Sequence, residues 1–336
     1  MISSLELARQ CGISQGTVDR ALHNRPGISA KTREKVLRMA KRNGYRPHPA
    51  ARELLTGQSL TVGAILPTVN NVFFMDLFNE LARALAKQNL RLQLTPVENR
   101  DAFLEMLEDF TARRYRLAVV IPPEDNIAVP RAITVGIPLI SLFSPCRGSG
   151  IRFLSADEEE TGRDAVRYLH RRGHQRILHL TYARRAYAIA ARAQGYKEQC
   201  EELDLTSKVL LNVDAINLRE ALQRYRPTAL FCHNDWMALR TMVLLSEIGL
   251  RVPEDISVLG VDNSPTLAAL QPGLTTLAYP LASIVDTIML ILAEKPSRLN
   301  LVRYLLVERS TVRKLTGQPR REKKSHDQKI QTHRES

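Results

Sequence analysis

Cysteine is scarce in this sequence of 336 residues. The four cysteines stand far apart in the chain, at Cys11, Cys146, Cys200 and Cys232. No two of them have the close spacing of a zinc knuckle or of a redox-active pair. We therefore expect reduced cysteines that serve in packing, and we expect neither a metal nor a cofactor.

Long hydrophobic runs are missing as well. No apolar run approaches the roughly 18 to 20 residues that a membrane-spanning helix needs. The first ten residues, MISSLELARQ, lack the basic segment followed by an apolar segment that marks a secretory signal. The sequence therefore predicts a cytoplasmic protein with no membrane partner.

Two common phosphate-binding motifs are also absent. The sequence contains neither the Gly-x-x-x-x-Gly-Lys-Ser/Thr loop nor the Gly-x-Gly-x-x-Gly fingerprint. His170 and His174 are four residues apart, but Gly173 should break the helix between them and no third metal ligand is apparent. The acidic run at 157–160 has the charge that stabilises a helix start, so we interpret it as structural. These observations predict that the protein is not an enzyme.

Positive charge, in contrast, is abundant and gathers at the two ends. The net charge is +13, and residues 1–60 hold 11 Lys and Arg against 4 Asp and Glu. Residues 313–336 hold 8 against 3, whereas the 252 residues between these segments hold 29 against 28. This distribution is typical of a module that binds a polyanion, attached to a neutral body. The polar segment 313–336 is predicted to be a disordered tail.

The basic N-terminal segment has the pattern of three short helices. Ser3 and Glu6 have the spacing of a capping box, so a first helix should begin there. Gly12 should end this helix, and Ser14 should cap a second one. A third helical pattern follows and ends at Gly44. Two short helices on either side of a glycine turn predict a helix-turn-helix head.

The start of the second helix should lie nearest the bases, because this part of a helix-turn-helix enters the major groove. Gln15, Gly16 and Thr17 occupy that position, and Gln pairs well with adenine. Arg20, one turn later, would reach guanine or phosphate. Asp19 is unusual there because a carboxylate repels phosphate; it would either accept from cytosine or hold Arg20 in place.

The central segment alternates short β-rich runs with helical patterns, which predicts parallel sheets covered by helices. About a dozen elements are too many for one small sheet, so we expect two similar α/β lobes. The strand candidates are 61–66, 118–121, 137–143, 176–181, 228–232 and 256–261. The helix candidates are 75–88, 101–114, 158–172, 188–203 and 236–248.

Candidate ligand-binding residues follow these strands, where ligands bind in open α/β sheets. Asp262 directly follows the strand at 256–261, Asn234 follows the strand at 228–232, and Arg192 lies in the helix after 176–181. Phe73 and Phe74 follow the first strand. Together they supply the donors, acceptors and ring faces that suit a hydroxyl-rich ligand.

Two neighbouring residues leave alternatives open. Asp235 is expected to cap the following helix rather than to bind ligand. Trp236 would either stack on a ligand ring or pack between the lobes.

The segment GISQGTVDRALHNRPGISAKTREKVLRMAKRNGYRPHPAARELLTGQS resembles the DNA-binding head and hinge of the lactose/galactose/purine repressor family of bacterial transcription regulators. The similarity continues through GHQRILHL, ARAQGYKEQ, PTALFCHNDWMAL, GLRVPEDISVLGVDN, PGLTTLAYP and LLVERSTV, and covers about residues 1–312. Two positions depart from the family pattern: Asp19 replaces a small polar residue, and Arg240 replaces a glycine. The first departure lies in the helix that is expected to read the DNA sequence.

The resemblance implies an all-α helix-turn-helix head with a hinge helix, joined to an α/β two-lobed body like a periplasmic binding protein. The expected boundaries are 1–46 for the head, 47–59 for the hinge, 60–156 for the first lobe and 157–281 for the second. The segment 282–312 is expected to return to the first lobe.

The resemblance also implies a function. We expect a homodimer or higher oligomer that represses transcription at a pseudo-palindromic double-stranded DNA operator. Its effector would be a sugar, sugar phosphate, nucleoside or purine bound by Arg192, Asn234 and Asp262, with Phe73 and Phe74 at a less strict aromatic site. Alternatives are an activator of the same architecture, or a solute-binding protein without a regulatory role.

Further DNA contacts are expected around the head and hinge. We assign Ser14, His23, Asn24 and Arg52 to this surface, together with the residues at the start of the second helix. The resemblance places Leu54 as the side chain that wedges into the minor groove at the operator centre.

Overall fold

The computed structural model describes residues 2–22, 25–45, 59–67, 71–183, 186–269, 271–296 and 303–315. Four predicted DNA-contact residues lie outside these ranges: His23, Asn24, Arg52 and Leu54. The predicted hinge, except for Ser59, and most of the predicted tail lie outside them as well. Among the described helices, none has the length and apolar character to cross a membrane.

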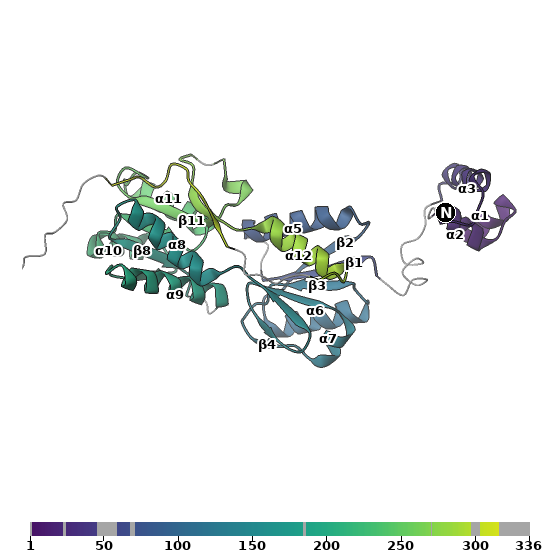
Figure 1. Ribbon diagram of the computed structural model, residues 1–336, viewed down its shortest axis with the longest axis horizontal. Helices are drawn as coiled ribbons and strands as arrows, with labels where there is room; N and C mark the ends of the chain where they lie inside the picture. Colours follow the sequence, from purple (N-terminus) through teal and green to yellow (C-terminus); the bar gives the residue numbers. More distant parts are fainter. Residues whose placement is uncertain are drawn as a thin grey trace, which may run out of the picture.

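The N-terminal head consists of three helices, as predicted. These are α1 (Ser4–Cys11), α2 (Gln15–Leu22) and α3 (Ala30–Arg42). The Ser3 hydroxyl accepts a hydrogen bond from the backbone N–H of Glu6 at 3.1 Å, and Gly12 ends α1 with a φ of +66°. The helices enclose a small core made of Leu7, Ala8, Cys11, Val18, Ala21, Val36 and Ala40. Figure 1 shows this head apart from the two lobes.

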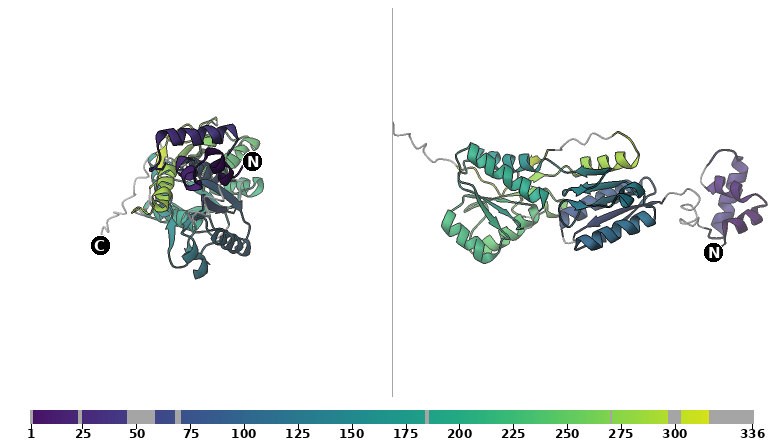
Figure 2. Two further views of the ribbon diagram at one scale, coloured as in Figure 1. Left: turned by 90° about the vertical axis from the view of Figure 1, so that its right-hand side faces the viewer. Right: turned by 90° about the horizontal axis from the view of Figure 1, so that it is seen from below.

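The first lobe contains a five-stranded parallel sheet with the strand order β2-β1-β3-β5-β7. The strands are β1 (Thr61–Leu66), β2 (Arg91–Pro96), β3 (Leu117–Val120), β5 (Leu139–Leu142) and β7 (Ile151–Leu154). The helices are α5 (Val72–Ala86), α6 (Arg100–Ala112) and α7 (Arg131–Gly136), and a small parallel pair joins β4 (Ile127–Ala128) to β6 (Cys146–Arg147). Figure 2 shows helices on both faces of the sheet.

The second lobe contains a six-stranded sheet with the order β13-β12-β11-β10-β8-β9. Its strands are β8 (Ile177–Thr181), β9 (Lys208–Leu211), β10 (Ala229–Cys232), β11 (Ser257–Asp262), β12 (Thr275–Ala278) and β13 (Leu305–Val307). Only the β12–β13 pair is antiparallel. The helices are α8 (Glu158–Arg171), α9 (Tyr187–Glu202), α10 (Ala215–Tyr225) and α11 (Asp235–Glu247), with the short turn η1 (Pro265–Leu267).

The C-terminal segment divides between the lobes. Helix α12 (Leu281–Leu292) packs against α5 of the first lobe (Figure 1). Strand β13, however, pairs with β12, and the Thr311 hydroxyl donates to the carbonyl oxygen of Val258 at 2.7 Å. The expectation that all of 282–312 returns to the first lobe is therefore wrong for its last third. The edge of β12 has backbone groups to pair, and β13 satisfies them.

Helices α8 and α9 pack unusually closely, and this contact positions two residues of the site. A Cβ atom added to Gly195 would lie 1.8 Å from the carbonyl oxygen of Glu159, and one added to Gly162 would lie 2.2 Å from that of Arg192. Glycine at both positions lets the two backbones touch. Glu158 and Arg192, one on each helix, are brought together by this approach.

Candidate ligand pocket and nucleic-acid interface

A cavity of about 430 Å³ lies between the lobes, beyond the carboxyl ends of their parallel strands. Its size falls in the range of small-molecule sites, roughly 300 to 1,000 Å³. All six residues predicted to bind an effector line it: Phe73, Phe74, Arg192, Asn234, Trp236 and Asp262. The structure therefore brings these residues together, while their role in binding an effector stays a prediction.

The cavity is centred on a buried ion pair that sequence reasoning missed. The Arg192 guanidinium donates to Glu158 Oε2 through Nη2 at 2.5 Å and through Nε at 3.2 Å. The side chains are 4% and 1% exposed. Burial acts to lower the pKa of Arg192, but Glu158, Tyr304 and Asp262 together outweigh it and the pKa is raised. Arg192 therefore carries its full charge, held by Glu158.

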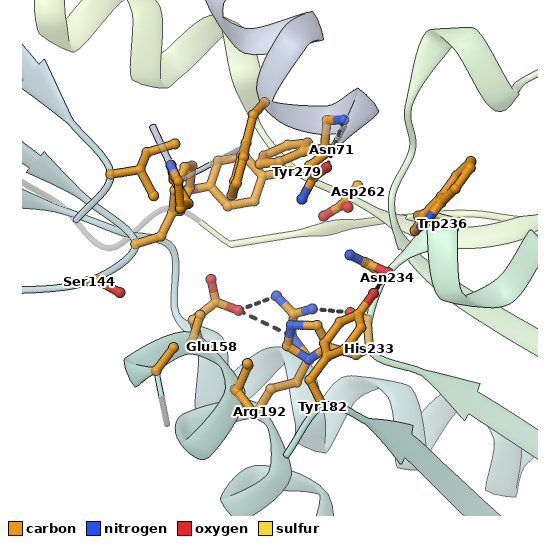
Figure 3. A pocket seen from close by; sticks show the side chains of 18 of the residues that line it. Asn71, Ser144, Glu158, Tyr182, Arg192, His233, Asn234, Trp236, Asp262 and Tyr279 are labelled. Carbon is orange, nitrogen blue, oxygen red and sulfur yellow. Dashed lines mark hydrogen bonds and ion pairs between the residues drawn. The ribbon is translucent and has the colours of Figure 1, made fainter. Parts of the chain in front are cut away.

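Two further groups complete the coordination of Arg192. Its Nη2 donates to the Tyr304 hydroxyl at 3.0 Å, and its Nη1 donates to the backbone carbonyl of His233. The Tyr304 hydroxyl in turn lies 3.2 Å from Glu158 Oε1, to which it donates. Figure 3 shows the guanidinium between Glu158 and His233, at the floor of the cavity. Four hydrogen bonds within the protein thus engage a group that has five N–H donors.

Glu158 belongs to the acidic run that we interpreted as a helix start. That interpretation is right for Asp157, which is the N-cap of α8 and accepts from the backbone N–H of Glu160 at 3.0 Å. Glu158 instead faces the cavity. Its partners lie 34 and 146 residues away in the chain, so no local pattern could identify them.

Asp262 is the second acidic group of the cavity. It ends β11 with a φ of +117°, which few side chains adopt, and its side chain points into the cavity (Figure 3). The residue is 8% exposed. Its pKa is raised well above the ordinary value, first because burial disfavours the charge and then because Asp235 lies nearby.

The cap of α11 is one residue earlier than predicted. Asn234, not Asp235, is the N-cap, and its Oδ1 accepts from the backbone N–H of Met237 at 2.9 Å and from the Tyr182 hydroxyl at 3.2 Å. Asn234 has the extended φ of −150° that a cap requires, whereas Asp235 already belongs to the helix. The prediction that Asp235 is the cap is therefore wrong.

Asp235 supports the loop after β11. Its carboxylate accepts from the Thr276 hydroxyl at 2.6 Å and from the backbone N–H of Ser264 at 3.1 Å. Burial raises the pKa of Asp235 to about 6, although these hydrogen bonds act in the opposite direction. The Ser264 hydroxyl also donates to the carboxylate of Asp76 in α5, so this loop joins the two lobes beside the cavity.

Aromatic side chains form the opposite wall of the cavity. The Tyr279 ring lies 5.1 Å from the ring of Phe73, 5.4 Å from that of Phe143 and 5.0 Å from that of Tyr304, measured between centroids. Edge-to-face contacts of this kind fix ring positions. Phe73 is thus anchored in the cluster, whereas Trp236 is 40% exposed. Sequence reasoning missed Tyr279, although it directly follows a strand.

The predicted base-contact residues lie at the start of α2. Ser14, Gln15, Gly16 and Arg20 are exposed and Thr17 is half-buried. The amide of Gln15 donates to the Ser4 hydroxyl at 2.7 Å, which orients this side chain from α1.

Asp19, which was expected to accept from cytosine or to hold Arg20, has a described partner on another residue. Asp19 accepts a hydrogen bond from Arg25 at 3.0 Å, and Arg25 begins the segment that leads to α3. A negative charge at this position therefore orients a basic residue beyond α2.

Comparison with known proteins gives two family matches. Residues 5–48 match the family described as bacterial regulatory proteins, lacI family, and residues 166–312 match the periplasmic binding protein-like domain. One relative is the HTH-type transcriptional repressor PurR of Vibrio atlanticus, 28% identical over 94% of this chain and 100% of the relative. Another is the HTH-type transcriptional regulator GalS of Salmonella typhimurium, 29% identical over 84% of this chain and 87% of the relative.

Solved structures have a similar fold. The lac repressor dimer bound to operator and the anti-inducer ONPF aligns with a TM-score of 0.76 at 22% identity, over 93% of this chain and 99% of that one. A ribose-bound regulator of the same family from Enterococcus faecium aligns with a TM-score of 0.66 at 22% identity, over 76% of this chain and 100% of that one. The predicted fold class, a helix-turn-helix head on an α/β two-lobed body, is confirmed.

Proposed function

The chain belongs to the lacI family of bacterial regulatory proteins, and from this membership we propose that it is a homodimeric repressor that binds a pseudo-palindromic operator and is controlled by a small effector. The observation that carries the proposal is the union, in one chain, of a helix-turn-helix head with a two-lobed body enclosing a lined cavity. Such a protein acts on DNA and is therefore placed in the cytoplasm. It is not an enzyme.

DNA binding is assigned to the head. The exposed start of α2, with Gln15 and Gly16, would enter the major groove, and Arg20 would contact guanine or phosphate. Two heads related by the dimer axis would read two half-sites. We retain Leu54 of the predicted hinge as the minor-groove wedge, although it lies outside the described residues.

Effector binding is assigned to the cavity. Relatives are named as the transcriptional repressor PurR and as a sucrose operon repressor, and related structures hold cellobiose, ribose or D-xylulofuranose. We propose that Asn234 and Asp262 bind the polar groups of a ring-shaped ligand, that Arg192 borders it, and that Phe74 and Trp236 cover its faces.

Control of DNA binding would follow from closure of the lobes. The effector touches residues of both lobes, so it favours whichever relative arrangement it fits best. The bond from Ser264 to Asp76 spans the same gap and would change with it. The coupling between the two sites is expected to amount to about 1 to 3 kcal/mol.

Selection from random DNA duplexes tests the function. The full-length protein without effector should enrich a near-palindrome, and its affinity should fall steeply with salt because Lys and Arg displace counterions from phosphates. Enrichment of no sequence would contradict the proposal.

Gln15→Ala tests whether the start of α2 contacts the bases. It should relax base preference at one position of each half-site by about 1 to 3 kcal/mol. The matched control is Gln223→Ala, an exposed glutamine in α10 of the second lobe, which should leave preference unchanged. A uniform loss of affinity across all sequences would show that Gln15 contacts only the DNA backbone.

A further inference from the structure

We propose that the effector carries an amine, and that its ammonium group binds beside Asp262 within the aromatic wall of the cavity. The inference rests on the proposed function, since it names the chemical class of the effector that this site takes. It predicts that ring compounds with an ammonium group bind more tightly than neutral or phosphorylated sugars.

The charge of the cavity is the first observation. Among the described residues that line it, the charged ones are Glu158, Arg192 and Asp262. Glu158 and Arg192 neutralise each other at 2.5 Å, with both side chains almost completely buried. The charge that remains for a ligand is therefore the single carboxylate of Asp262.

The environment of Asp262 is the second observation. The described part of the chain provides no hydrogen bond to its carboxylate, and the residue is 8% exposed. Asp235 on α11, Glu158 on α8 and Asp76 on α5 oppose its ionisation, and Arg192 on α9 favours it. A buried carboxylate in such surroundings is satisfied by a cation or stays protonated. An ammonium group supplies both the charge and the N–H donors that are lacking.

The aromatic wall is the third observation. Tyr279, Phe73 and Phe143 line the same cavity as Asp262 and are held by edge-to-face contacts at 5.1 to 5.4 Å; Figure 3 shows Tyr279 on the side of the cavity next to Asp262. Ring faces attract cations as well as apolar groups. A carboxylate combined with aromatic rings is therefore a suitable site for an organic cation.

The same arrangement disfavours an anion. A phosphate needs N–H donors, and the guanidinium of Arg192 already donates to Glu158, to Tyr304 and to the backbone of His233. A phosphate would also approach the carboxylates of Glu158 and Asp262. The arginines at 184 and 185, which precede α9, lie outside the described residues and do not enter this comparison.

Sets of three ligands that share one ring system and differ in the charge of a substituent test the proposal. The probes are D-glucose, D-glucosamine and D-glucose 6-phosphate; D-galactose, D-galactosamine and D-galactose 6-phosphate; and adenosine, 5′-amino-5′-deoxyadenosine and adenosine 5′-phosphate. The full-length protein is melted with each at millimolar concentration, and the Kd of every binder is measured by calorimetry. In at least one set the amine should bind about tenfold or more tightly than the neutral member, with the phosphate weakest.

Variants assign the preference to individual residues. Asp262→Asn should bring the amine and the neutral member to the same Kd, whereas Glu158→Gln should release Arg192 and strengthen binding of the phosphate. The control is Asp204→Asn, an exposed residue after α9 with a φ of +53° that asparagine adopts readily, and it should keep the wild-type order. If a variant fails to fold, the order of the Kd values measured with the wild-type protein decides whether the proposal holds.

The dependence of binding on pH provides an independent measurement. At pH values where the amine itself stays protonated, affinity for the amine should rise with pH as Asp262 ionises, and affinity for the neutral member should not. The proposal is overturned if no amine raises Tm. It is also overturned if, in every set that binds, the neutral or phosphorylated member binds more tightly than the amine. The selection of an operator by the effector-free protein is a separate experiment. If that selection succeeds and the amines fail to bind, the amine inference is rejected and the proposed function is not.

Discussion

The buried pair of Glu158 and Arg192 allows a quantitative prediction about stability. We consider Glu158→Leu, Arg192→Met and the double variant, which replaces both charges by apolar side chains of similar size. Each single change leaves one charge with a side chain 4% exposed or less and without its main partner. Breaking a buried pair in this way costs about 3 to 5 kcal/mol.

The double variant should behave differently. With both charges gone, no buried ion is left uncompensated, and apolar replacement of a buried pair is often neutral or stabilising, by roughly 1 to 4 kcal/mol. The Tyr304 hydroxyl loses Arg192 as a donor and Glu158 as an acceptor, which offsets part of that gain by about 1 to 3 kcal/mol. The double variant should therefore be more stable than either single variant.

Urea unfolding of the four proteins, followed by circular dichroism at pH 7, measures the coupling in a double-mutant cycle. The single variants should also melt about 6 to 20 °C below wild type, because 1 kcal/mol corresponds to about 2 to 4 °C in a domain of this size. If the two single effects simply add in the double variant, Glu158 and Arg192 do not act as a pair. That result would also remove the charge argument for an amine ligand.

Three further changes give sharp expectations. Asp262→Asn should stabilise the ligand-free protein increasingly as pH rises above about 4, because the unfolded chain then loses the Asp262 proton while the raised pKa keeps the folded carboxyl protonated, so that the wild type loses stability until the pH reaches this raised pKa; an equal effect at pH 5 and pH 8, measured by thermal melts, would refute this. Gly195→Ala should cost about 1 to 3 kcal/mol, since its Cβ would meet the backbone of α8 at 1.8 Å, and unchanged urea unfolding would contradict that close packing. Gly16→Ala should stabilise the head by up to about 1 kcal/mol, because the nearest atom to its Cβ lies 3.9 Å away, yet weaken operator binding in a gel shift; undiminished binding would show that DNA does not approach Gly16 closely.

The positions of most predicted strands followed from sequence because each is a short β-rich run bounded by helical patterns. The run at 61–66 matches β1, and the run at 228–232 contains β10. The strands that sequence reasoning missed include β2 and β9, which are the outer strands of their sheets. Their residues are largely half-buried or exposed, so they lack the continuous apolar signal of a central strand.

The candidate site was predictable where it depends on topology. Parallel strands end on one side of a sheet, so Asn234 and Asp262 had to lie near each other once 228–232 and 256–261 were recognised as strands. Glu158 and Tyr304 were not predictable in this way. Their positions depend on the close contact of α8 with α9 and on the return of the chain to β13, which are long-range features.

An unfavourable backbone conformation and a buried carboxylate occur together in the cavity, and this combination has a physical explanation. Asp262 combines a left-handed φ of +117° with a carboxylate that is 8% exposed, and each of these costs stability on its own. Asp235 holds the loop that follows Asp262 in place, because its carboxylate accepts from the backbone N–H of Ser264 and from the Thr276 hydroxyl. Such over-determined strain is retained in proteins chiefly where a ligand relieves it. An effector that neutralises Asp262 would therefore gain binding free energy by relieving this strain. It would bind next to the loop in which Ser264 contacts α5 of the other lobe. Binding and closure thereby act on the same few residues.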